Sequence, residues 1–217
     1  MTNRNLSVSI KIAIAAVAWV ALGLQLYILV SNTPANGMTF LQALGRFFLF
    51  FTILSNLLAA ISITLPWVIP HSWIGRFLSK PSQISAIAVY IFIVGLVYNT
   101  VLRKLWQPRG LQQIADELLH VAVPVLFTVY WIFFVSKGTL KWKHAIAWLL
   151  FPFIYLIYAI ARGSIEGFYP YPFLDLHKLT YTHLMLNCIG LTAAFLVTGL
   201  VFIAVDKAMA SKSAIRY

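Results

Sequence analysis

The apolar runs of this chain constrain its fold more than any other feature. Several of them approach or exceed the ~20 residues that a helix needs to cross a bilayer. A soluble domain with 61% hydrophobic and only 10% charged residues would not stay in solution. We therefore predict an all-α, polytopic membrane protein, with residues 1–217 forming a single domain of six transmembrane helices. The expected spans are residues 10–30, 45–68, 84–102, 114–135, 144–161 and 183–205.

The charges of the loops predict the direction of these spans. With a cytoplasmic N-terminus, ten of the 16 lysines and arginines fall on the inner side and six on the outer side. The positive-inside rule then places both termini in the cytoplasm, and the short loops suit a bacterial inner membrane. Basic loops facing anionic membrane lipids also explain the net charge of +11, so no nucleic-acid partner is expected. The oligomeric state is left open.

Two further features limit the function classes. Cys188 is the only cysteine, which excludes an intrachain disulfide and a CxxC metal site. Residues 1–30 place basic residues before an apolar run, as a signal peptide does, but the run is too long, so we expect a retained first span.

Polar side chains inside the spans are expected at one depth. Thr52 lies seven residues into the second span and His120 about six residues into the fourth, so both lie ~10 Å deep at ~1.5 Å per residue. Both spans descend from the outer side. Polar residues in a membrane are costly and tend to face a bundle interior or a cavity. We therefore predict a polar pocket in the outer-leaflet half of the bundle.

Helical spacing assigns inward faces to four spans. Residues three or four positions apart share one face of a helix, and small residues beside polar ones favour close packing around a pocket. The expected inward stripes are Gly45, Thr52, Asn56, Ala59 and Ile63, with Ser55 at the edge; Ala88, Phe92, Gly95 and Asn99, with Arg103 one turn further; Asp116, His120, Pro124 and Thr128; and His183, Asn187, Gly190 and Ala194.

This set of side chains has the residue types of an acyl hydrolase. A threonine hydroxyl becomes nucleophilic when a neighbouring base takes its proton, and histidine is the natural base near neutral pH. We predict Thr52 as the nucleophile and His120 as the base, with no cofactor. The expected supporting residues are Asp116 to orient the imidazole, Asn56, Asn99 or Asn187 to donate to an oxyanion, and Ser55 and His183 nearby; Arg46 and Arg103 would hold a fatty carboxylate or phosphate.

Each of these residues also has a structural interpretation. The hydroxyl of Thr52 can bond the carbonyl of Phe48, as membrane threonines often do. Asn56 can serve as a hydrogen-bonding link between helices. Arg46 and Arg103 can extend to lipid headgroups.

Two motifs carry a resemblance to a known family. FTILSNLL in the second span and HVAVP in the fourth resemble the androgen-induced-gene family of integral-membrane hydrolases and its bacterial six-span branch. EGFYPYPFLD, residues 166–175, is also similar to the bacterial branch. The resemblance implies cleavage of fatty acid esters of hydroxy fatty acids, or of similar acyl lipids, by a threonine and a histidine at the positions of Thr52 and His120.

Two other functions remain open from the sequence. His120, His183, Asp116 and Glu117 have the ligand types of a zinc-dependent hydrolase, although no HExxH-like spacing is present. A non-enzymatic lipid-binding or transport protein would use the same polar cluster to bind a headgroup. The aromatic segment 166–175 is expected on the membrane surface, as a connector or as a lid.

Overall fold

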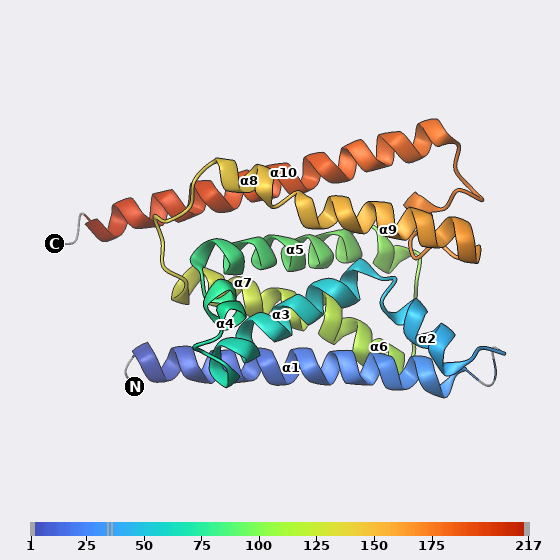
Figure 1. The fold of residues 1–217 in the computed structure, drawn as a ribbon, viewed down its shortest axis with the longest axis horizontal. Helices are drawn as coiled ribbons and strands as arrows, with labels where there is room; N and C mark the ends of the chain where they lie inside the picture. The colour runs from blue at the N-terminus through green and yellow to red at the C-terminus, as the bar shows by residue number, and fades with distance from the viewer. Residues whose placement is uncertain (1–2, 34, 36, 215–217) are drawn as a thin grey trace. The chain divides into compact units, whose positions relative to one another are not determined.

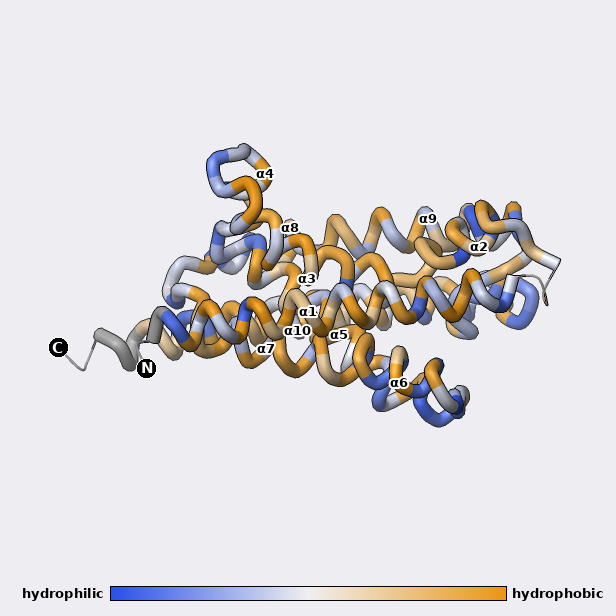
Figure 2. Tube along the Cα trace, turned by 90° about the horizontal axis from the view of Figure 1, so that it is seen from below, coloured by the Kyte–Doolittle hydropathy of each residue, from blue (hydrophilic) through white to orange (hydrophobic). Residues whose placement is uncertain are grey.

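The computed structural model describes residues 3–33, 35 and 37–214, and over these residues the regular secondary structure is helical. The predicted all-α class is confirmed. Six helices are long and apolar enough to cross a membrane, which makes the chain an integral multi-pass membrane protein. Within the described residues these are Asn5–Ser31, Phe51–Val68, Pro81–Lys104, Leu111–Phe134, Lys143–Glu166 and Tyr181–Ala210. Figure 2 shows hydrophobic residues along most of each long helix and hydrophilic residues around α4 (Trp73–Leu78) and α6 (Leu111–Glu117).

The chain forms two compact units, Met1–Ser136 and Lys137–Tyr217. That residues 1–217 form a single domain therefore stays a prediction.

Unit 1 is built around four long helices, visible in Figure 1. They are α1 (Asn3–Ser31), α3 (Phe51–Val68), α5 (Pro81–Thr100) and α7 (Val123–Phe134). The helices α1 and α5 each pack against both α3 and α7, so the four close into a bundle. A buried hydrogen bond of 2.7 Å from the Trp131 indole to the Ser85 hydroxyl joins α7 to α5.

The second predicted span is interrupted. The structure has α2 (Phe40–Phe47), a break at residues 48–50, and then α3. The helix α2 starts with a capping box in which Thr39 and Gln42 bond each other's backbone N–H groups. The expectation of one continuous helix over 45–68 is therefore wrong, and Thr52 occupies the first turn of α3 rather than a position seven residues into a helix.

The fourth span changes its helical pitch in the middle. It consists of α6, a π-helical turn at Leu118–Ala122 (η2) and α7. Turns of this kind are rare and occur frequently at functional sites. His120 is the central residue of this turn.

Unit 2 contains α8 (Lys143–Ala147), α9 (Leu150–Glu166), a short 3₁₀ turn at Pro172–Leu174 and α10 (Tyr181–Ala214). The long helix α10 packs against the other three elements. The carboxylate of Asp206, 1% exposed, accepts the backbone N–H of Leu140 at 3.1 Å. This bond ties the loop before α8 to α10.

Two of the predicted inward faces differ from the structure. On α5, Phe92 is exposed, and the buried face includes Tyr98 instead. On α10, His183 is exposed, whereas Leu184, Phe195 and Asp206 are buried. Both helices are apolar almost all round, so their sequence periodicity does not distinguish the side facing protein from the side facing lipid.

Candidate active site

Thr52 and His120 meet inside unit 1. The Thr52 hydroxyl oxygen lies 3.3 Å from Nε2 of His120, although the residues are 68 positions apart. Thr52 is buried at 7% exposure, and the imidazole is 11% exposed. The predicted approach of these two side chains is confirmed.

The other ring nitrogen of His120 selects the tautomer that a base requires. Nδ1 lies 2.9 Å from the backbone carbonyl oxygen of Asp116, one turn earlier. A carbonyl oxygen only accepts hydrogen bonds, so Nδ1 carries the proton and donates it. Nε2 is then the acceptor, and the Thr52 hydroxyl donates to it.

The carboxylate of Asp116 does not orient the imidazole in the way the sequence suggested. Its nearest oxygen lies 4.0 Å from Nδ1, beyond hydrogen-bonding distance. The carboxylate instead accepts the Tyr98 hydroxyl at 2.7 Å and the Gln112 amide at 3.3 Å. The Gln112 amide also donates to the Gln25 side chain of α1 at 2.8 Å. The orienting role passes to the backbone carbonyl of Asp116. Its carboxylate joins α6 to α5 through Tyr98, and Gln112 joins α6 to α1 through Gln25.

Tyr98 covers one face of the imidazole. The two rings are stacked, with centroids 3.8 Å apart and planes inclined by 12°. The guanidinium of Arg103 lies over the same tyrosine ring, 5.3 Å from its centroid, and forms a salt bridge of 2.7 Å with Glu117. Arg103 is thus engaged by a carboxylate and an aromatic ring, which argues against its predicted role as an anion holder.

In the π-helical turn, the backbone carbonyl of Leu119 lacks its usual helical donor and accepts a hydrogen bond from α3. In a regular α-helix the carbonyl of Leu119 would accept the N–H of Val123. That N–H donates instead to Leu118, and the next residue, Pro124, has no N–H. The carbonyl of Leu119 accepts the side-chain amide of Asn56 at 3.1 Å. The buried asparagine of α3 therefore holds the turn that carries the histidine.

A second backbone carbonyl of the turn, that of His120, accepts a hydrogen bond from α5. The α-helical donor to His120 would again be Pro124, which cannot donate. The His120 carbonyl accepts the side-chain amide of Asn99 at 3.3 Å. A Cβ on Gly95 would lie 3.2 Å from this carbonyl and 3.0 Å from the Cβ of Pro124, so glycine allows α5 to approach closely.

The two asparagines are therefore not placed as oxyanion donors. The amide of Asn56 also donates to the Thr52 carbonyl at 2.8 Å, and that of Asn99 to the Gly95 carbonyl at 2.8 Å. An amide has two N–H groups, so both amides are fully committed to backbone carbonyls. Their expected oxyanion role is replaced by a positioning role.

The break before α3 adds an electrostatic feature at Thr52. Thr52 is the second residue of α3, so it lies at the end of the helix where the macrodipole is positive. One turn further, Ser55 is 0% exposed, and its hydroxyl has no hydrogen-bond partner among the described residues. Negative charge that develops on an atom next to Thr52 is stabilised by this helix end.

The remaining predicted residues are Arg46 in unit 1 and His183 and Asn187 in unit 2. Arg46 is half-buried in the last turn of α2. His183 and Asn187 belong to unit 2: the first bonds the Thr180 hydroxyl at 2.8 Å, and the amide of the second donates to the Phe173 carbonyl at 3.0 Å. Their membership of the pocket stays a prediction.

The zinc alternative has no ligand set in the part of the chain that the structure describes. Within that part, no group of three or more His, Cys, Asp and Glu side chains could hold a metal ion. Two glutamines that were not predicted as site residues, Gln25 and Gln112, belong to the hydrogen-bond network of Asp116. An amide within an apolar span is unusual enough that Gln25 could have been identified beforehand, whereas Gln112 precedes the predicted span 114–135.

Comparison of the chain with protein-family models, curated proteins and solved structures gave no match.

Proposed function

We propose that this protein is an intramembrane ester hydrolase in which Thr52 is the nucleophile and His120 the general base. One observation carries the proposal: the Thr52 hydroxyl lies 3.3 Å from a histidine nitrogen whose partner nitrogen bonds a backbone carbonyl. A hydroxyl bonded to an oriented imidazole is the arrangement that activates a nucleophile.

The reaction proceeds by acyl transfer in two steps. The Thr52 oxygen attacks the ester carbonyl carbon while its proton passes to Nε2 of His120. The bond to the leaving alcohol breaks, and Nε2 returns the proton to that oxygen. Water then attacks the acyl-threonine, gives one proton to Nε2 and releases the fatty acid, after which the proton returns to Thr52. One ester and one water yield one acid and one alcohol.

The surroundings favour a lipid ester as the substrate. Both side chains are largely buried, and each lies in a span that is apolar enough to cross a bilayer, so an aqueous substrate has no ready access. The positive end of α3 favours the oxyanion of the tetrahedral intermediate. Fatty acid esters of hydroxy fatty acids fit this description. They are also the substrates implied by the resemblance of FTILSNLL and HVAVP to the androgen-induced-gene family.

The direction in the membrane belongs to the same proposal. With a cytoplasmic N-terminus, ten lysines and arginines lie on the cytoplasmic side and six on the outer side. This excess favours cytoplasmic termini in a bacterial inner membrane. The pair would then lie in the outer leaflet.

A fluorophosphonate probe tests the proposal directly. The purified full chain in detergent is treated with the probe, and the labelled peptide is mapped. We expect labelling at Thr52 that is lost in His120→Ala, together with hydrolysis of para-nitrophenyl octanoate that falls by about 10²–10⁴-fold in the same variant. Thr52→Val should abolish both signals, and Thr52→Ser should retain them.

Two hydroxyl variants serve as matched controls. Ser55→Ala removes a buried hydroxyl one turn away. Thr64→Val removes one that donates to the Ala60 carbonyl at 2.8 Å and accepts the Trp19 indole N–H at 3.1 Å. Both should keep labelling and turnover. Labelling that persists in Thr52→Val would reject Thr52 as nucleophile. A chain that binds the ester without turnover in any form would indicate the non-enzymatic lipid-binding alternative.

A further inference from the structure

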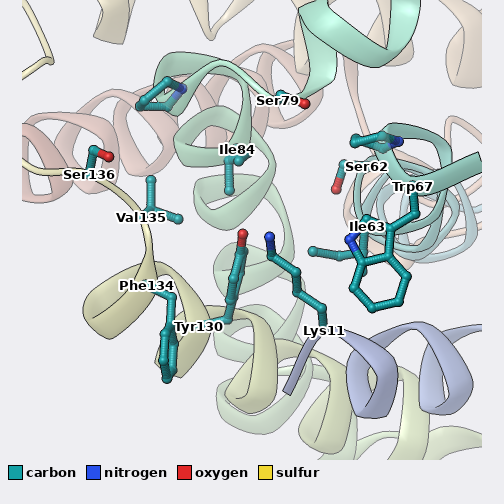
Figure 3. Close-up of a pocket in the computed structure, with 12 residues that line it drawn as sticks. Lys11, Ser62, Ile63, Trp67, Ser79, Ile84, Tyr130, Phe134, Val135 and Ser136 are labelled. Carbon is teal, nitrogen blue, oxygen red and sulfur yellow. The ribbon is translucent and has the colours of Figure 1, made fainter. Parts of the chain in front are cut away.

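A cavity of about 200 Å³ lies in unit 1 at the helix ends opposite to Thr52. It is bounded by residues near the start of α1 and α5 and the end of α3 and α7, whereas Thr52 stands at the start of α3. Figure 3 shows the side chain of Lys11 extending into it beside the hydroxyl of Tyr130. Ser62, Ser79 and Ser136 add hydroxyl groups to the wall.

Lys11 brings an uncompensated positive charge to this cavity. Its ammonium lies 5.7 Å from the centroid of the Tyr130 ring. Residues 1–136 contain only two carboxylates, Asp116 and Glu117, and both are engaged in the network around His120 and Arg103. Among the described residues no carboxylate forms an ion pair with Lys11. An ammonium within an apolar span calls for an anionic partner.

The size of the cavity limits what that partner is. Pockets that enclose a whole drug-sized ligand measure ~300–1,000 Å³. About 200 Å³ holds a compact polar group, whose apolar remainder must lie outside. Trp67, which lines the cavity, is 47% exposed, so the wall continues onto the outer surface of the bundle.

The neighbouring segment has the character of a membrane interface. In α4, Trp73 is 72% and Phe77 40% exposed, and the ammonium of Lys80 lies 5.8 Å from the centroid of the Phe77 ring. Exposed aromatic side chains with basic neighbours are typical of the headgroup level. Residues 66–84 contain Arg76 and Lys80 but no acidic residue, which favours anionic lipids.

We propose that this cavity binds the phosphate of an anionic phospholipid, with Lys11 as the charged ligand and the Tyr130 hydroxyl as a second donor. The acyl chains lie outside, along the lipid-facing surface beside Trp67. The site is separate from the Thr52–His120 pair. It is tested by binding, so it stands whether or not that pair hydrolyses esters.

Native mass spectrometry of the purified full chain tests the proposal. Dioctanoyl phosphatidylglycerol is titrated against dioctanoyl phosphatidylcholine, which has the same chains and no net charge. We expect the anionic lipid to bind about tenfold more tightly and Lys11→Gln to remove that preference, because a charge-assisted bond inside a cavity is lost. Tyr130→Phe, which removes a single oxygen, should weaken the preference about threefold and keeps the test informative if Lys11→Gln fails to fold.

Lys80→Gln is the matched control, because it removes the same charge from the same end of the unit but does not line the cavity. It should change the preference by less than about twofold, because its ammonium lies over the Phe77 ring and not in the cavity, and an exposed charge contributes little. An equal loss in Lys80→Gln, or an unchanged preference in both Lys11→Gln and Tyr130→Phe, would overturn the proposal. Displacement of the lipid by inorganic phosphate at equal concentration would identify a site for free anions and would also overturn it.

Discussion

Tyr98 contacts both His120 and Asp116. Its ring is stacked on the imidazole of His120, with centroids 3.8 Å apart, and its hydroxyl donates to the Asp116 carboxylate at 2.7 Å. The rotation of the imidazole is thus set by an aromatic surface of α5, while its tautomer is set by a backbone carbonyl of α6. These two restraints lead to separate predictions.

Two substitutions of Tyr98 should separate the effect of ring stacking on ester turnover from the effect of the hydrogen bond to Asp116. Tyr98→Phe keeps the ring and loses the bond to Asp116, so ester turnover should fall by less than about tenfold. Tyr98→Ala removes the surface that holds the imidazole, and a misplaced base should lower turnover by about 10²-fold. Both rates are measured with para-nitrophenyl octanoate. Equal losses would mean that the hydroxyl, not the ring, is the important part.

Asp116→Asn should be a mild substitution. The backbone carbonyl that accepts Nδ1–H of His120 is unchanged, and the carboxylate oxygen is already 4.0 Å away. Turnover should therefore stay within about tenfold of the wild type, against a loss of about 10²–10⁴-fold in His120→Ala. If the two variants are equally inactive, the carboxylate orients the base after all.

Asn56→Leu should destabilise the fold. The substitution keeps the approximate size of the side chain but leaves the carbonyls of Thr52 and Leu119 without their amide donor. The expected loss of unfolding free energy is about 1–3 kcal/mol, measured by titration with SDS from mixed micelles. The matched control is Asn187→Leu, where the half-buried amide donates to the single carbonyl of Phe173, and its loss should be smaller.

Pro124→Ala should impair turnover without destabilising the protein. Alanine supplies the N–H that proline lacks, and this donor competes with Asn99 for the carbonyl of His120. The turn should relax, and a shift of the imidazole by about 1 Å lowers turnover by about 10²-fold. Thermal unfolding should occur at the same temperature or higher. Pro66→Ala in α3 serves as the control for removing a helix proline and should leave turnover unchanged.

The loop before α8 should make stability depend on pH. Burial lowers the pKa of Lys137 from its ordinary 10.5 to about 8, against the opposing attraction of Asp206. Between these values the unfolded chain binds more protons than the folded chain, so stability should rise as the pH increases from about 8 to 10.5. Below pH 8 the contribution is constant. Thermal midpoints across this range should lose that rise in Lys137→Gln, and an identical rise in the variant would assign it to other groups.

The fold class was predictable because it depends on length: six apolar runs predict six spans. The approach of Thr52 to His120 was also predicted and is confirmed. Their common depth, counted along one continuous helix, stays a prediction. The break at 48–50 was missed because RFFLFF contains neither glycine nor proline. The capping box of Thr39 and Gln42 was the available signal, since it starts a helix five residues before the predicted span.

The faces of α5 and α10 and the roles of the asparagines were not predictable in the same way. In lipid both the outward and the inward side of a helix are apolar, so the periodicity that orients a helix in water is absent. The oxyanion role of Asn56 and Asn99 failed for a different reason. Their amides are used by carbonyls that become available only because of the π-helical turn. Pro124, four residues after His120, was the one mark of that turn in the sequence.

The π-helical turn also has a consequence for biogenesis. Before α3 packs against the π-helical turn η2, the carbonyl of Leu119 and the amide of Asn56 would each be exposed to hydrocarbon, where an unsatisfied polar group is costly. Lateral association of the inserted spans relieves both at once. The contact that satisfies these two groups also fixes the turn that carries His120 next to Thr52, so packing of the spans and placement of this pair depend on the same hydrogen bond.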